Sequence, residues 1–186
     1  MLVGKWPTEL DTKVTFNRSD KGFRYLGIVI TTQTSQLFNE NFGRLSTQIK
    51  SDLTRWEILP LSLLGRIETV RMNILPRLTY LFQSLPIWIP ASNFKMWDKM
   101  ISAFIWQKRK PRIRQKLLFS PKGKGGLSLP NLKLYYWAAQ LRSMVEWVVQ
   151  DEETNWIGLE SHACPLVPLE TMPFMEQKKM ERFKNC

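Results

Sequence analysis

The chemistry most readily inferred from this sequence is phosphate binding. The segment from residue 108 to residue 116 reads Lys-Arg-Lys-Pro-Arg-Ile-Arg-Gln-Lys, and two more lysines follow in a glycine-rich stretch. Cationic side chains neutralise phosphates, and nearby aromatic residues (Trp106, Tyr135 and Tyr136) are suited to base stacking. A solvated charge run or a nuclear-import signal is the alternative. We expect nucleic-acid contacts from eight cations: Lys108, Arg109, Lys110, Arg112, Arg114, Lys116, Lys122 and Lys124.

The positive charge of the chain is confined to one region. The 186 residues include 27 Lys and Arg against 16 Asp and Glu, a net charge of +11. No acidic residue lies between Asp98 and Glu146, and that window holds 11 cations, so the rest of the chain is balanced. Such localisation indicates a polyanionic partner, with nucleic acid favoured over an acidic membrane.

Residues for catalysis or metal binding are scarce. One His and two Cys are too few for a zinc site or a disulfide framework. The sequence Gly123-Lys-Gly-Gly126 lacks the spacing of a nucleotide-binding P-loop, so we expect a flexible basic turn there. No catalytic constellation is found, and no metal ligands or cofactor are expected in this chain. Without a signal peptide or an apolar membrane span, we expect an intracellular protein of the nucleus or cytoplasm, not a secreted one.

Hydrophobic periodicity predicts a mainly α-helical fold that begins with a β-hairpin. The hairpin pairs residues 14–16 with 23–31 across a turn at 17–22, and helices follow at about 36–58, 62–84, 91–107 and 130–150. Pro76 should kink or divide the second helix, whose polar side carries Arg66, Asn73 and Arg77. From spacing alone, that stripe is equally a nucleic-acid contact or a solvated helix face.

The last predicted helix carries one apolar face, and an irregular tail follows it. The face consists of Leu134, Ala138, Leu141, Val145 and Val148. We expect a loosely ordered tail from residue 151, with a helix near 174–184. The expected parts are therefore a hairpin at 1–35, a helical bundle at 36–107, a basic loop with its following helix at 108–150, and the tail at 151–186.

A series of short motifs resembles one family. The run Phe23-Arg-Tyr-Leu-Gly-Ile-Val-Ile30 is similar to the strand after the catalytic palm of reverse transcriptases from non-LTR (LINE-type) retrotransposons. Further motifs keep the order and spacing of that family's helical thumb and the stretch beyond it, over about residues 14–150. They include Leu37-Phe-Asn-Glu-Asn-Phe42, Asp52-Leu-Thr-Arg-Trp56, Met72-Asn-Ile-Leu-Pro76, Phe104-Ile-Trp106 and Gly125-Gly-Leu-Ser-Leu-Pro130.

The resemblance implies roles that the spacing alone does not provide. The residues matching the family's primer grip, which holds the 3′ end of the growing DNA, are Phe23, Tyr25, Leu26 and Gly27. The helices that follow would form a thumb along the template–primer duplex, with Arg66, Asn73 and Arg77 contacting its backbone. The basic stretch after Trp106 would contact template RNA or target DNA.

The family's catalytic residues are not found in this chain. Polymerisation requires carboxylates that bind two Mg²⁺ ions, and no Asp-Asp pair occurs here. The sequence therefore resembles an internal fragment of an RNA-directed DNA polymerase, expected to be inactive alone, with Mg²⁺ belonging to a palm supplied elsewhere. The expected partners are RNA, DNA or their hybrid, and that palm. The alternative is a helical adaptor whose basic loop binds an acidic protein or a membrane surface.

Overall fold

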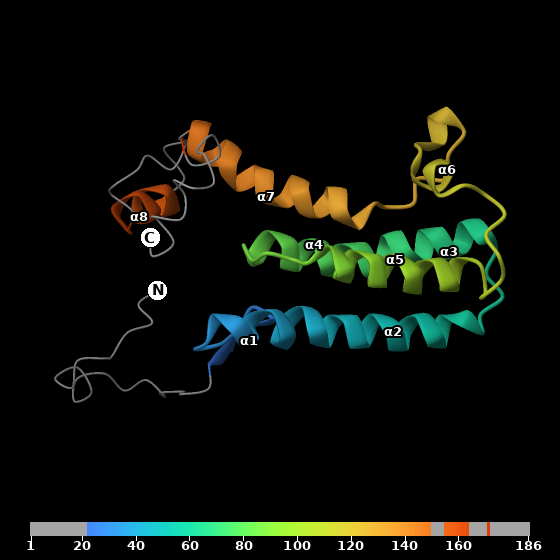
Figure 1. The fold of residues 1–186 in the computed structure, drawn as a ribbon, viewed down its shortest axis with the longest axis horizontal. Helices are drawn as coiled ribbons and strands as arrows, with labels where there is room; N and C mark the ends of the chain where they lie inside the picture. The colour runs from blue at the N-terminus through green and yellow to red at the C-terminus, as the bar shows by residue number, and fades with distance from the viewer. Residues whose placement is uncertain (1–21, 150–154, 164–170, 172–186) are drawn as a thin grey trace. The chain divides into compact units, whose positions relative to one another are not determined.

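The fold is mainly α-helical, with a two-stranded antiparallel hairpin near its N-terminus (Figure 1). The computed structural model describes residues 22–149, 155–163 and 171. These residues divide into two compact units, one containing residues 22–81 and 87–129, the other containing residues 82–86 and those from 130 onward. The predicted fold class is confirmed.

The described hairpin lies within the segment that was predicted to form a single strand. Strand β1 (Phe23–Tyr25) pairs with β2 (Ile28–Ile30), and Tyr25 is opposite Ile28, so only Leu26 and Gly27 form the turn. Both turn residues have positive φ, at 46° and 86°, as a type I′ turn requires. The prediction of one strand over 23–31 is therefore wrong, since this turn divides it into two. The turn was not predicted because leucine seldom adopts a left-handed conformation. The expected partner strand and turn at 14–21 lie outside the described residues.

Replacing Leu26 with asparagine should stabilise the hairpin. The left-handed conformation costs an ordinary residue about 1–2 kcal/mol, and the Leu26 side chain is 73% exposed, so little packing would be lost. Asparagine before Gly27 provides the sequence favoured in type I′ turns. We expect L26N to raise the free energy of unfolding by about 1 kcal/mol in urea titrations. L26A is the control, and an equal gain from it would contradict the conformational explanation.

A long helix follows, and its packing matches the predicted periodicity. It consists of α1 (Thr34–Phe38), a π-helical turn η2 (Asn39–Gly43) and α2 (Arg44–Glu57). Its buried apolar residues are Phe42, Leu45, Ile49 and Leu53. The buried Asn41 fixes the hairpin to this helix, because its amide accepts from the Val29 N–H at 2.9 Å and donates to the Val29 carbonyl at 2.8 Å.

The second helix passes through Pro76 by means of a π-helical turn. Ser62 caps α3 (Leu63–Thr69), and η3 (Val70–Ile74) leads into α4 (Leu75–Ser84), whose second residue is Pro76. The wider turn lies immediately before the proline, which cannot donate a backbone hydrogen bond. Buried positions along this helix step by four residues: Arg66, Val70, Ile74 and Leu78.

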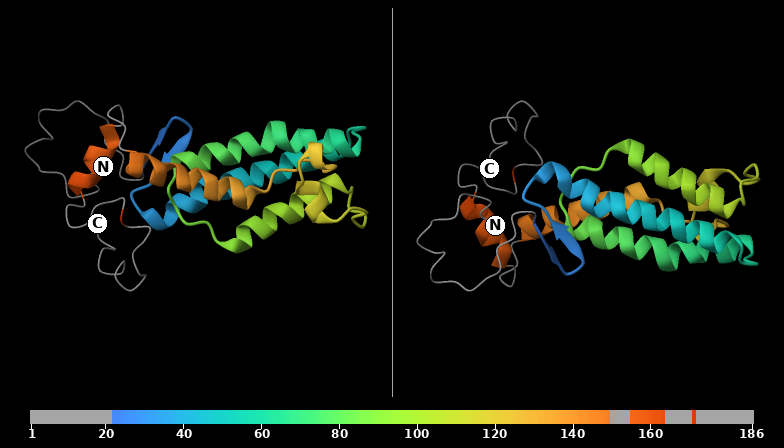
Figure 2. Two further views of the ribbon diagram at one scale, coloured as in Figure 1. Left: turned by 90° about the horizontal axis from the view of Figure 1, so that it is seen from above. Right: turned by 90° about the horizontal axis from the view of Figure 1, so that it is seen from below.

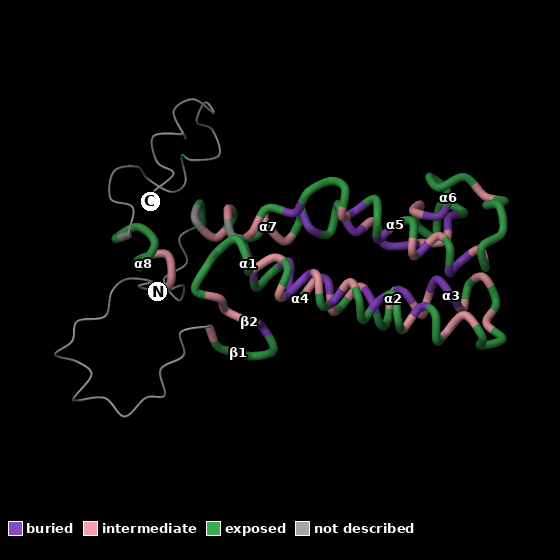
Figure 3. Tube along the Cα trace, turned by 60° about the horizontal axis from the view of Figure 1, so that its bottom comes forward, coloured by how far each residue is buried: buried purple, intermediate pink, exposed green. Residues whose placement is uncertain are grey.

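Helix α5 (Ala91–Ile105) completes a layer of long helices in the first unit. Its predicted apolar face is buried (Phe94, Trp97, Ile101, Phe104 and Ile105). The helix packs against α2 and α3, and successive helices run antiparallel (Figures 1 and 2). The Trp97 indole donates to the Ser46 hydroxyl at 2.8 Å. Figure 3 shows the buried segments along the inner faces of these helices.

The second unit contains α7 (Leu132–Val149) and α8 (Asn155–Ala163). The Tyr136 ring packs edge-on against Phe82, and the Gln140 amide donates to the Phe82 carbonyl at 2.8 Å. The predicted apolar face of α7 is exposed, including Leu134, Leu141, Val145 and Val148. Of the predicted tail the structure describes helix α8 and Thr171, and the helix expected at 174–184 lies outside the described residues.

Candidate nucleic-acid interface

The basic segment begins at a sharp reversal of the chain after α5. Gln107 and Lys108 have φ of 51° and 61°, so two successive non-glycine residues are left-handed. The Lys108 N–H donates to the Ala103 carbonyl at 2.9 Å, and its ammonium pairs with the Glu57 carboxylate at 3.0 Å. Lys108 therefore secures the start of the segment to α2, and its charge is already partly neutralised.

Six cations beyond Lys108 are exposed and make no ion pair within the described part of the chain. In residues 22–149 and 155–163 none of them makes an ion pair with a carboxylate, and each is exposed to solvent. They lie on the segment 109–114, on α6 (Gln115–Phe119) and on the short helix η4 (Lys122–Lys124). This cluster, which we call the free cations, consists of Arg109, Lys110, Arg112, Arg114, Lys116 and Lys124. Exposed cations without carboxylate partners are available to phosphates.

Lys122 belongs to the same loop but is held by α3. Its ammonium pairs with Glu68 at 2.8 Å, and Arg71 contacts the same carboxylate at 3.0 Å. The hydrogen bond from Lys122 is the main cause that lowers the pKa of Glu68 below its usual value. The pair therefore persists at neutral pH and is lost when acidification protonates Glu68.

The glycine-rich stretch forms the expected basic turn, and backbone hydrogen bonds hold the residues that follow it. The N–H groups of Leu127, Ser128 and Leu129 donate to the carbonyls of Leu117, Ser120 and Leu118 at 2.7–3.2 Å. Gly126 is buried, and a Cβ atom there would lie 2.0 Å from the Ser120 carbonyl oxygen. Only glycine permits this approach, so the loop presents Lys124 from a fixed backbone.

Alanine at position 126 should disrupt this loop, whereas alanine at position 123 should not. The added Cβ of G126A would collide with the Ser120 backbone, while nothing lies within 4 Å of the corresponding position at Gly123. We expect amide hydrogen exchange at Leu127, Ser128 and Leu129 to accelerate at least tenfold in G126A, which corresponds to about 1.4 kcal/mol of lost local protection. Unchanged exchange in G126A, or equal acceleration in G123A, would contradict the role of this close approach.

The stripe formed by Arg66, Asn73 and Arg77 is not a common surface. Arg66 is only 1% exposed, and its guanidinium donates to the carbonyls of Glu57, Leu59 and Phe104 at 3.2–3.3 Å. It also lies over the Phe104 ring, at 4.9 Å from the centroid. The prediction of backbone contacts from Arg66 is therefore wrong, because the side chain joins α3 to the ends of α2 and α5.

The other two members of the stripe lie nearer to solvent. Asn73 is exposed and donates to the Thr69 carbonyl at 3.1 Å. Arg77 is half-buried, donates through Nε to the Asn73 carbonyl at 2.7 Å and pairs with Asp52 on α2 at 2.9 Å. Arg77 thus connects two helices, and of the three residues only Asn73 is exposed.

Three of the predicted primer-grip residues, Tyr25, Leu26 and Gly27, form the tip of the hairpin, whereas Phe23 begins β1 at the opposite end, where it pairs with Ile30. Phe23, Tyr25 and Leu26 are all substantially exposed, and Gly27 completes the turn. The Tyr80 hydroxyl on α4 donates to the Leu26 carbonyl, so the tip is fixed to the helical layer. Sequence reasoning did not assign Tyr80 this role. A strained, exposed leucine held in place by a hydrogen bond is the kind of feature found at binding sites.

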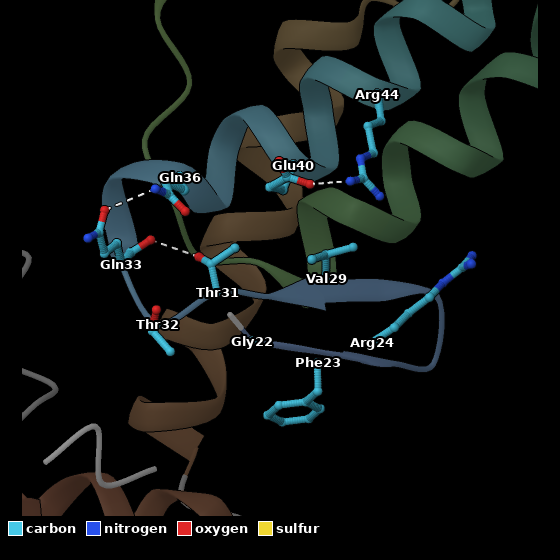
Figure 4. A pocket seen from close by; sticks show the side chains of 10 residues that line it. All are labelled: Gly22, Phe23, Arg24, Val29, Thr31, Thr32, Gln33, Gln36, Glu40 and Arg44. Carbon is cyan, nitrogen blue, oxygen red and sulfur yellow. Dashed lines mark hydrogen bonds and ion pairs between the residues drawn. The ribbon is translucent and has the colours of Figure 1, made fainter. Parts of the chain in front are cut away.

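A polar pocket of about 640 Å³ lies at the other end of the hairpin (Figure 4). Gly22, Thr31 and Gln33 line it, together with Arg24 and Arg44. The Arg44 guanidinium pairs with Glu40, as the dashed line shows. One of its two arginines is thus already neutralised, so this pocket is less suited to phosphates than the free cations.

Comparison with models of known protein families finds no match for this chain. Among the described residues, no cluster of three or more His, Cys, Asp or Glu could hold a metal ion, and no helix is long and apolar enough to cross a bilayer. The resemblance to LINE-type reverse transcriptases, the roles that it implies and the Mg²⁺ of a separate palm stay predictions.

Proposed function

We propose that this chain is a nucleic-acid-binding module, a thumb-like part of a LINE-type RNA-directed DNA polymerase whose catalytic palm is supplied elsewhere. The observation that carries the proposal is the cluster of six free cations on ordered backbone at one end of the helical layer. Glu57 and Glu68 pair with Lys108 and Lys122, but no carboxylate among the described residues pairs with these six cations. The motif series supplies the family, and the exposed hairpin tip supplies a second contact surface.

Binding by these cations would depend on phosphates and not on sequence. Side chains that contact the backbone fix the position of a protein on a duplex without reading its bases. About six neutralised phosphates give a log–log salt slope of roughly −5. Catalysis is not part of the proposal for this chain alone, because polymerisation requires metal-binding carboxylates that the sequence does not supply.

Fluorescence anisotropy with a labelled RNA–DNA hybrid tests the proposal. We expect the affinity to fall steeply between about 50 and 200 mM salt with the slope given above, and two hybrids of unrelated sequence to bind equally. Undetectable or salt-insensitive binding would contradict it. Co-sedimentation with anionic liposomes that exceeds hybrid binding would favour the alternative, a helical adaptor for acidic surfaces.

A further inference from the structure

A second pocket lies directly beside the free cations and combines apolar walls with positive charge. It has a volume of about 350 Å³, within the range of small-ligand sites. Leu61, Leu63 and Ile105 line it together with the half-buried Trp106, which ends α5. Three free cations line the same pocket, namely Arg109, Lys110 and Arg112.

The electrostatics of this pocket favour an anion. None of its nine lining residues is acidic. The buried Arg66 is among them, and its Nε has no hydrogen-bond partner among the described residues. The guanidinium is held by carbonyls, so its positive charge stays uncompensated by any carboxylate in the described part of the chain. A charge in such low-dielectric surroundings adds to the field of the surface cations and concentrates it in the pocket.

We infer that this pocket binds a single unpaired nucleotide of the nucleic acid, an inference that rests on the proposed function. A nucleotide combines a flat apolar base with a phosphate, and the pocket offers both matching surfaces. The base would stack against Trp106 among the leucine and isoleucine side chains, and the phosphate would contact Arg109 and Arg112. An indole accepts any base for stacking, so the site would select unpaired strands without selecting sequence.

Two reversals of the chain place these surfaces together. The left-handed residues Gln107 and Lys108 turn the segment back after α5, and the Arg109 N–H donates to the Trp106 carbonyl at 2.9 Å. On the other side, Leu61 and Ser62 connect α2 to α3, and the Ser62 cap fixes where α3 begins. The pocket is therefore built from ordered connections, which retain its shape before a nucleotide binds.

The test compares a blunt hybrid with one that has a single-stranded overhang, both with the same number of phosphates. A 2-aminopurine in the overhang reports stacking by loss of its fluorescence. We expect the wild-type chain to bind the overhang hybrid about tenfold more tightly, the amount that stacking of one base supplies. L63W, which fills the pocket, and W106L, which removes the indole, should abolish this preference and leave blunt binding and its salt slope unchanged.

The neighbouring variant L64W is the matched control, since Leu64 is exposed and does not line the pocket. It should keep the preference. L63W and W106L alter different walls of the pocket, so the test still works if one of them does not fold. Thermal melts followed by circular dichroism show which variants fold. Equal binding of the two hybrids by the wild type, with a steep salt slope, would overturn the inference alone, whereas absence of binding to both would overturn the proposed function as well. If anionic vesicles compete with the overhang hybrid and L63W abolishes this competition, the inferred nucleotide would be wrong and the pocket would bind a lipid headgroup.

Discussion

Replacement of Arg66 with methionine is expected to lower the free energy of unfolding by about 3–5 kcal/mol. The substitution keeps much of the apolar stem but removes the donors to the carbonyls of Glu57, Leu59 and Phe104. A buried acceptor that loses its partner costs about 1–3 kcal/mol, and this applies to the Phe104 carbonyl. The carbonyls of Glu57 and Leu59 are partly buried, so the loss of their donors adds a smaller cost. The contact with the Phe104 ring is lost as well. A domain of this size is stabilised by only about 5–15 kcal/mol, so R66M should approach unfolding at 37 °C.

Arg77 provides the control for this experiment. It lies on the same continuous helix and makes one ion pair with Asp52, but it remains 35% exposed. Pairs that are open to solvent contribute about 0–1 kcal/mol, so R77M should change stability little. Urea unfolding followed by far-UV circular dichroism measures both variants. Similar small losses in R66M and R77M would show that the carbonyls near Arg66 find other donors.

The sequence predicted the long helices well because their apolar residues repeat at the helical period. The faces expected around Ile49, Val70 and Trp97 are buried as predicted. Periodicity identifies residues that share a face, but it does not say whether another element covers that face. The apolar side of α7 shows the difference, since Leu141 and Val145 are aligned as expected and yet exposed.

The errors in the candidate site have two physical causes. A spacing of seven and four residues aligns Arg66 with Asn73 and Arg77 on an ideal α-helix, but arginine was assumed to be solvated. Three carbonyls made its burial possible, and one of them, that of Phe104 on α5, is distant in sequence. The hairpin turn was missed because Leu26 has an unfavourable conformation that no local propensity anticipates. The burial of Arg66 depends on a tertiary contact with Phe104, and the conformation of Leu26 is accompanied by one with Tyr80.

In the segment 107–129, the charge pattern of the sequence predicts where cations gather but not which of them form ion pairs. The run of cations was evident from the sequence, but the division into free and paired members was not. Glu57 and Glu68 lie about fifty residues before the lysines that they bind, on helices whose packing decides the pairing. Lys108 and Lys122 thereby act in holding the loop, and the remaining cations carry the excess charge.

Neutralising three free cations should weaken duplex binding about a hundredfold at about 0.15 M salt. The variant combines Arg109→Gln, Lys110→Gln and Arg112→Gln. Each lost phosphate contact lowers the magnitude of the log–log salt slope by about 0.9, so the slope should change by nearly 3. Glutamine retains polarity and length, and none of these three side chains makes an ion pair with a described carboxylate, so the fold should be preserved.

The matched control neutralises three exposed lysines elsewhere in the first unit: Lys50, Lys95 and Lys99. Both triple variants have the same net charge, so a general attraction between a basic protein and a polyanion would weaken equally in each. If the free cations form the binding surface, the magnitude of the log–log salt slope should fall only in the first variant, because counterions are released only where phosphates are contacted. Anisotropy titrations of both variants at four salt concentrations separate these outcomes, and equal slopes would mean that the net charge, and not the loop, attracts the nucleic acid.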